Sequence, residues 1–111
     1  MKVFLPHVPI RRDPISGNTA PIVNLNPALA FGELVPLLAP DRFVHGDYLQ
    51  DAVDDCREAA KQIGVEDWIC CLGDSVLLAV TLMTAGERNG RVKLLRWDRN
   101  KRTYNPVEIE L

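Results

Sequence analysis

Gly73, Asp74 and Ser75 are the residues whose types and order best suit ligand chemistry. They follow the apolar run Trp68–Leu72 and precede a long apolar stretch, so they stand where a strand would turn into a helix. The first amides of a helix lack partners inside it and attract anions, so this turn predicts a phosphate or carboxylate site. The alternative, which we favour, is structural: Gly73 makes the turn and Asp74, which would repel an anion, caps the helix.

Asp98 and Arg99 extend this candidate site, because they follow the next predicted strand. The carboxyl ends of parallel strands meet along one edge of a sheet, so both residues would lie near the glycine turn. The predicted ligand site therefore consists of Gly73, Asp74, Ser75, Asp98 and Arg99. Asp41, Asp74 and Asp98 would bind Mg²⁺ only if they converged, and we expect no metal and no cofactor.

Catalytic chemistry is not indicated by the remaining polar residues. His7 and His45 have no second ligand at a spacing that suggests zinc. Ser16 and Ser75 lack a recognisable base partner for acyl transfer. We predict no catalytic residue and favour a non-enzymatic role.

Basic residues gather in the C-terminal third of the chain. Seven of the thirteen Lys and Arg residues fall within 88–102, and only Glu87 and Asp98 oppose them over residues 86–103. Cations that track phosphates beside aromatic rings that stack on bases form nucleic-acid surfaces. The residues that would do so here are Arg91, Lys93, Arg96, Trp97, Lys101 and Arg102, with Tyr104 nearby.

Two other interpretations of this basic stretch stay open. It would protect a sheet edge from aggregation, which we favour, or it would meet an acidic helix of a neighbouring subunit. Strand alternation scatters its charges over both faces of a sheet, which disfavours a single nucleic-acid patch.

The acidic helix is predicted over residues 47–63. Apolar residues recur there at intervals of three and four, and Asp47 with Gln50 resembles a capping box. The opposite face is rich in acids, seven against two basic residues over 47–67. We interpret it as a solvated helix face.

A second helix, from Ser75 to about Arg88, is apolar almost all round. Such a helix must be buried on several sides, and a small domain has little interior to surround it. We therefore predict that it contacts another chain, with Leu78, Leu82 and Met83 as interface residues. A fully intramolecular core helix is the alternative.

The N-terminal third is less regular. Residues 2–25 predict an irregular hairpin, with Lys2–Leu5 as an edge strand or arm because Pro6 and Pro9 follow it. Residues 27–38 fit either a helix over Pro27–Val35 or a single turn at 27–31 followed by a strand over Glu33–Leu38, and we prefer the second.

The predicted fold is one α/β domain over residues 1–111. It has a small mixed sheet, a Rossmann-like βαβ core around the Gly73 turn, two main helices, and a C-terminal hairpin whose strands are 91–97 and 103–111. A chain of 111 residues with 47% hydrophobic and 25% charged residues is ordinary for a globular domain.

Composition also bears on the compartment. The three cysteines, Cys56, Cys70 and Cys71, do not have the spacing of a disulfide framework and suit a reduced core. No apolar run reaches the roughly 18 residues of a membrane span. We expect a cytoplasmic protein without membrane contact.

Several segments together resemble a family of small proteins of tailed bacteriophages. The resemblance rests on Gly73-Asp74 with its apolar helix, on Gly90–Arg99, on Tyr104–Ile109, and on the N-terminal stretches 21–28 and 31–35. It brings no activity and no catalytic residue. It implies a role in the host cytoplasm during infection, commonly the binding of a host factor.

We therefore predict a non-enzymatic interaction protein, encoded by a phage and acting on a host or phage protein as a homo-oligomer. A phosphate- or nucleotide-binding protein using the Gly73 turn is the first alternative. Nucleic-acid binding through the basic hairpin is the second and the less favoured partner class.

Overall fold

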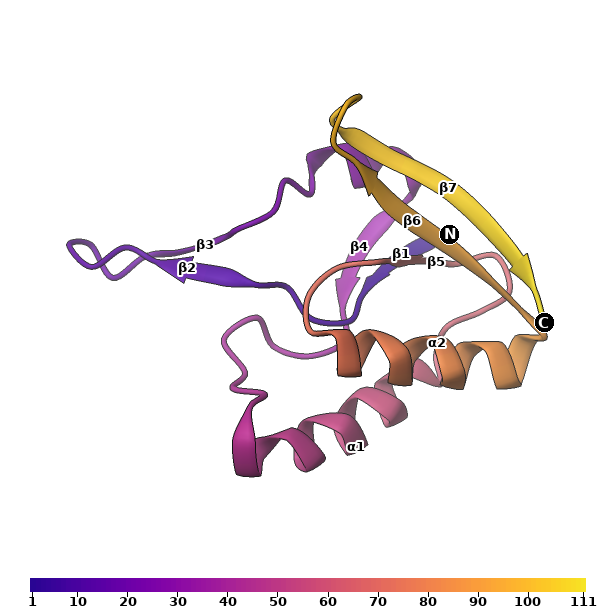
Figure 1. Ribbon diagram of the computed structural model, residues 1–111, viewed down its shortest axis with the longest axis horizontal. Coiled ribbons are helices and arrows are strands. Elements are labelled where there is room, and N and C mark those ends of the chain that lie inside the picture. The colour runs from indigo at the N-terminus through magenta and orange to yellow at the C-terminus, as the bar shows by residue number, and fades with distance from the viewer.

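The computed structural model describes residues 1–111 and is built on a five-stranded sheet. Its strands are β1 (Lys2–Leu5), β4 (Glu33–Pro36), β5 (Trp68–Cys70), β6 (Arg91–Asp98) and β7 (Thr103–Glu110). They are ordered β4-β1-β5-β6-β7 (Figure 1). β4, β1, β5 and β6 run parallel to one another, and β7 pairs antiparallel with β6 at the edge. The predicted mixed α/β fold, with a parallel core and a C-terminal edge hairpin, is confirmed.

Two helices, α1 (Leu49–Ala60) and α2 (Ser75–Asn89), lie on one face of this sheet (Figure 1). Their inward stripes meet the sheet in one core, in which Cys56 of α1 and Leu77 of α2 pack with Phe4 and Ile69 of the strands. This burial of apolar area is the main contribution to holding the two layers together. No helix is both long enough and apolar enough to span a bilayer.

The start of α1 differs from the predicted capping box. Residues Gly46–Tyr48 form a 3-10 turn, η2, that runs directly into the helix, and Tyr48 is the N-cap without any side-chain cap. Asp47 therefore lies inside the turn and not at the cap. Gln50 instead donates a hydrogen bond to Asp54 at 3.0 Å.

α2 begins as the sequence predicts. The Asp74 carboxylate accepts hydrogen bonds from the amides of Val76 (2.9 Å) and Leu77 (3.2 Å). The buried stripe of the helix is Leu77, Thr81, Ala85 and Gly86. Thr81 tolerates burial because its hydroxyl donates to the Leu77 carbonyl at 2.8 Å. α2 thus buries one stripe only, although it is apolar on nearly every side.

The second face of the sheet is covered by chain without long helices. Its core holds Val3, Leu5, Trp68, Leu95 and Tyr104 beneath residues 22–31. That cover includes η1 (Asn26–Phe31), a 3-10 helix that precedes β4. The preferred interpretation of residues 27–38, a single turn followed by a strand, is confirmed.

The N-terminal hairpin is displaced from its predicted place. β1 is an interior strand between β4 and β5, and the prediction of an edge or arm for Lys2–Leu5 is wrong. Pro6 and Pro9 do not exclude this position, because they follow the strand and remove no donor from its ladder. The hairpin is formed by β2 (Ile10–Arg12) and β3 (Thr19–Pro21), which project from the body as an arm (Figure 1).

Candidate functional site

The crevice in which α/β sheets commonly bind ligands is closed in this protein. β1 and β5 are neighbours in the sheet. The next sheet strand after β1 in the chain is β4, on one side of this pair, and the next after β5 is β6, on the other side, so the carboxyl ends of β1 and β5 form the switch point of the sheet. There the backbone of Gly73 lies against that of His7, so closely that a Cβ on Gly73 would overlap the His7 carbonyl oxygen. Backbone packing therefore occupies the space that a ligand would need.

The predicted ligand residues are divided by this arrangement. Asp74 already occupies the amides of Val76 and Leu77, which a phosphate would require, while Ser75 is exposed at the helix start. Asp98 is engaged in the β6–β7 turn, where it accepts from the amides of Asn100 and Lys101. The Lys101 amide and then the Asn105 side chain, which donates at 3.0 Å, lower the pKa of Asp98 below its ordinary value. Ligand binding by this set stays a prediction.

A cavity of about 400 Å³ lies beside the closed crevice, and we call it the Trp97 cavity. Three separate segments line it: Ile22, Val23 and Asn24; Cys71, Leu72 and Gly73; and Trp97 with Tyr104. Gly73 and Trp97, which the sequence assigned to different candidate sites, thus share one cavity. Neither periodicity nor motif spacing indicated that residues 22–24 would complete it.

Two aromatic rings form one wall of the Trp97 cavity. The rings of Trp97 and Tyr104 are 5.0 Å apart at 65°, an edge-to-face pair. Tyr104 is buried and its hydroxyl donates to the Asn24 carbonyl at 2.9 Å, which fixes the ring. Burial, together with the Cys70 thiol, raises the pKa of Tyr104 above its ordinary value, so this hydroxyl stays protonated at neutral pH.

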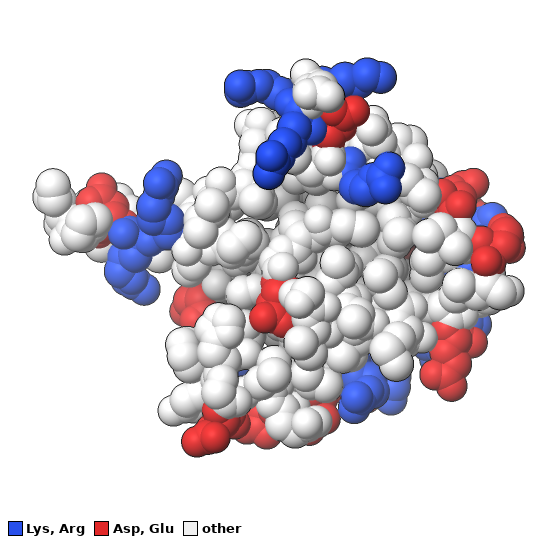
Figure 2. All heavy atoms as spheres, in the orientation of Figure 1, with Lys and Arg blue, Asp and Glu red and all other residues white.

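The predicted nucleic-acid residues separate into engaged and free cations. Arg91 and Lys93 reach Glu66 at 2.7 and 3.6 Å, and Lys93 is only 6% exposed. Arg96 is on the helix-side face of β6, opposite to Trp97. Lys101 and Arg102 stand exposed in the β6–β7 turn with Arg99, and none of these three has an ion-pair partner within 4.0 Å. Figure 2 shows basic side chains gathered around this turn.

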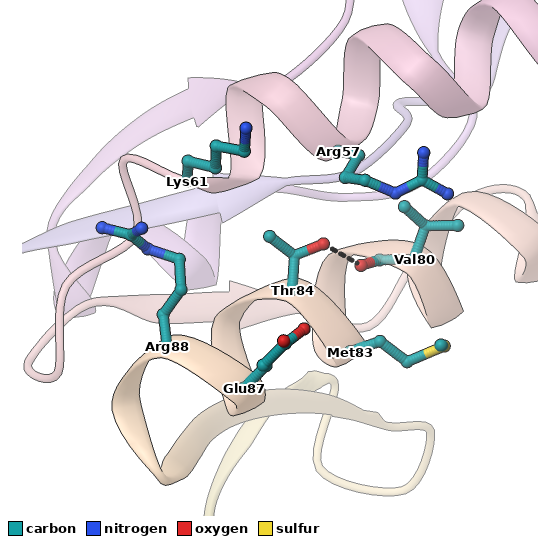
Figure 3. Close-up of a pocket in the computed structure, with 7 residues that line it drawn as sticks. All are labelled: Arg57, Lys61, Val80, Met83, Thr84, Glu87 and Arg88. Atoms are coloured by element: carbon teal, nitrogen blue, oxygen red, sulfur yellow. Dashed lines mark hydrogen bonds between the residues drawn. The ribbon is translucent and has the colours of Figure 1, made fainter.

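A shallow groove of about 280 Å³ runs between α1 and α2 (Figure 3). Arg57 and Lys61 reach it from α1, and α2 contributes Val80, Met83, Thr84, Glu87 and Arg88. The Thr84 hydroxyl donates to the Val80 carbonyl at 2.8 Å, so it is satisfied within its own helix. Three cations and one carboxylate line the groove, and two of these cations, Arg57 and Lys61, also pair with Asp54 and Glu58 of α1.

The acidic face of α1 is less acidic than its sequence suggests. Asp54 and Glu58 pair with Arg57 and Lys61 along the helix, and Asp55 pairs with Arg42 at 2.8 Å. These surface pairs are each worth only about 0–1 kcal/mol, but they leave few free carboxylates for a basic partner. No group of three His, Cys, Asp or Glu residues is placed to hold a metal ion.

Exposed apolar residues lie on α2 and at the end of β7. We call this surface the α2–β7 face, and it comprises the exposed Val76, Ala79, Met83, Ile109 and Leu111 with the half-buried Val107. Met83 is 71% and Leu111 75% exposed, and Leu111 lies against Gly86 of α2. Figure 2 shows that the centre of the surface between α2 and the β6–β7 hairpin carries no charged side chain.

The predicted interface residues fall unevenly on this surface. Met83 points into solvent, whereas Leu78 and Leu82 are half-buried against the helix-side core. Helical spacing alone did not indicate that Val76 and Ala79 lie on the exposed side. The contribution of β7 depends on tertiary packing and was not visible in the helix pattern.

These elements define a small two-layer α/β protein with one projecting arm. Residues 1–111 match the model of a family described as Phage Pam3 gp32-like protein, and the chain belongs to this family. The predicted membership in a family of phage proteins is thereby confirmed. No curated protein and no solved structure matches the chain.

Proposed function

We propose that this phage protein is a non-enzymatic interaction protein that assembles with further copies of itself through the α2–β7 face. The single observation that carries the proposal is that Met83 of α2 is exposed together with Ile109 and Leu111, where Leu111 lies against Gly86 of the same helix. Contiguous apolar surface of this kind is typical of protein–protein contacts, whereas isolated exposed apolar residues are ordinary. A flexible methionine at its centre suits an interface, since it adapts to its partner.

Charge on the two sides of this face favours a second copy as the occupant. The cations of the α1–α2 groove border it on one side, and on the other side lies the edge strand β7 with Glu110 and with Glu108, which also approaches Lys93 at 4.0 Å. When two copies pack face to face around a two-fold axis parallel to α2, the groove of each lies against the β7 edge of the other. Such an arrangement places opposite charges together at the rim.

Extension of the sheet from β7 is a less suitable mode of assembly. Pro106 stands in the middle of this edge strand, opposite Leu95 of β6, and it lacks a backbone donor. Proline and charged residues on an edge strand disfavour pairing with another strand. The contact therefore uses side chains of the helix-side face.

In an infected cell, such an assembly would present several copies of the remaining surfaces to a host or phage protein.

Light scattering across a range of protein concentrations tests this proposal. We expect a dimer or a larger closed assembly, and we expect Met83→Glu to shift it to monomers because a carboxylate would be buried in the contact. Leu29→Glu is the matched control, since Leu29 is 57% exposed but belongs to η1 on the other side of the sheet. A monomer at high concentration, or an assembly that Met83→Glu leaves unchanged, would contradict the proposal.

A further inference from the structure

The Trp97 cavity lies on the sheet face opposite to the α2–β7 face, so it stays open in the proposed assembly. We propose that it binds a nucleobase, stacked on Trp97, whose phosphate is held by the cations of the β6–β7 turn. The shared chemistry is that of a nucleotide unit, which either a free nucleotide or a single strand of nucleic acid supplies.

The cavity has the size and lining of a ligand site. Its volume of about 400 Å³ lies within the usual range for small-molecule pockets, and six of its eight lining residues are hydrophobic. Trp97 is 37% exposed although it is a large aromatic side chain, so part of its surface is accessible to a partner. Trp97 packs against the Tyr104 ring, and that ring is fixed by the hydrogen bond from the Tyr104 hydroxyl to the Asn24 carbonyl. A base stacking on Trp97 would meet a supported platform.

The cations adjoin this platform in sequence and in space. Arg99, Lys101 and Arg102 follow Trp97 in the turn that separates it from Tyr104, and none of them is neutralised by an ion pair. Asp98 is the one acid of the turn, and it is held by the turn amides and by Asn105. The site therefore favours an anionic ligand.

The projecting arm adds positive charge on the opposite flank. Arg11 and Arg12 are exposed on β2, and residues Ile22–Asn24 of the cavity wall continue directly from β3 of the same arm. Figure 2 shows basic groups on both projections, the arm and the β6–β7 turn. Cations on two sides of an aromatic cavity match the pattern in which phosphates run past a stacked base. An acidic protein would also satisfy the cations but not the aromatic cavity.

Fluorescence anisotropy with a short fluorescein-labelled oligothymidylate tests the proposal on the intact protein. We expect saturable binding at low salt that weakens as salt is added, because phosphate contacts release counterions. Trp97→Ala is expected to weaken binding roughly tenfold or more, while Trp97→Phe retains most of it because a ring remains for stacking. Lys101→Gln should reduce the slope of log K against log salt by about one. Lys2→Gln, at the amino end of β1, is the control with the same change in charge.

Competition separates the two sources of the ligand. If thymidine 5′-monophosphate displaces the labelled strand at a comparable nucleotide concentration, the ligand is a free nucleotide. If the strand binds at least about tenfold more tightly than the mononucleotide, the ligand is single-stranded nucleic acid. Both outcomes support the shared chemistry. Absence of binding at low salt with millimolar nucleotide, or binding that Trp97→Ala leaves unchanged, would overturn the proposal. Neither result depends on the oligomeric state, which Met83→Glu tests separately.

Discussion

The ammonium group of Lys93 lies 4.1 Å from the centroid of the Trp68 ring, on the sheet face away from the helices. Glu66 and Glu108 approach the same group at 3.6 and 4.0 Å, and its nitrogen also donates to the Glu66 carbonyl at 3.4 Å. A charge this deeply buried is tolerated because ring and carboxylates replace the water that it loses. The arrangement gives Lys93 a structural role.

Replacing Lys93 by methionine keeps the stem but removes the charge. We expect Lys93→Met to lower the free energy of unfolding by about 1 kcal/mol, since a partly desolvated cation–π contact is worth roughly 0.5–2 kcal/mol. Lys101→Met, at an exposed position without an ion pair, should change it by less than about 0.5 kcal/mol. Urea denaturation measures both variants. A Lys93→Met protein more stable than the wild type would show that the cost of burying the charge exceeds these contacts.

Gly73 is expected to be the glycine least tolerant of substitution. Its φ is +83° and an added Cβ would overlap the His7 carbonyl oxygen, whereas Gly17 has a φ of +75° with no atom within 4 Å of such a Cβ. Gly17→Ala should therefore cost about 1 kcal/mol for the left-handed backbone alone. Gly73→Ala should cost about 3 kcal/mol or more, because the chain segments that contain Gly73 and His7 must also move apart to make room for the Cβ. Similar melting temperatures for the two variants would contradict this packing.

His7 is expected to make the protein less stable in acid. Desolvation by burial lowers its pKa below the ordinary 6.5, and Asp74 partly opposes that shift. The unfolded chain therefore takes up the proton first, so stability is present above pH 6.5 and is lost as the pH falls below it. Asp74→Asn keeps a capping side chain but removes the charge, and it should lower the pKa of His7 further. Imidazole titration by NMR measures this, with Asp13→Asn as the control; an unchanged or higher pKa in Asp74→Asn would refute the coupling.

Cys70 should make the protein less stable in alkali. Burial raises the pKa of its thiol from 9.0 to about 12, and burial also raises that of the neighbouring Tyr104. Above pH 9 the unfolded chain releases protons that the folded chain retains, so the free energy of unfolding falls by at most about 1.4 kcal/mol per pH unit for each such group. Urea midpoints between pH 8 and pH 11 should decline less steeply in Cys70→Ala. An equal decline in both proteins would exclude Cys70 as the cause.

The sequence predicted those parts of the fold that depend on local pattern. The cap at Asp74, the end of the second helix near Arg88 and the strands of the C-terminal hairpin all involve residues near one another in the chain, so composition and spacing suffice to indicate them. The interior position of β1 was missed, because its partners Glu33–Pro36 and Trp68–Ile69 are distant in sequence. The prolines after β1 also led to the wrong prediction, because a proline excludes an interior strand only where it removes a donor from the hydrogen-bond ladder.

For the candidate sites, the sequence by itself determined which chemistry the chain carries: a glycine turn, a group of cations with an aromatic pair, and a helix with an apolar surface. Only the tertiary structure decided how these are combined. It closed the crevice at Gly73 with the backbone of His7, buried Lys93 over Trp68, and placed Gly73 beside Trp97 and residues 22–24. The physical reason is that availability to a ligand depends on burial and on neighbours brought from distant segments, and no local pattern contains either.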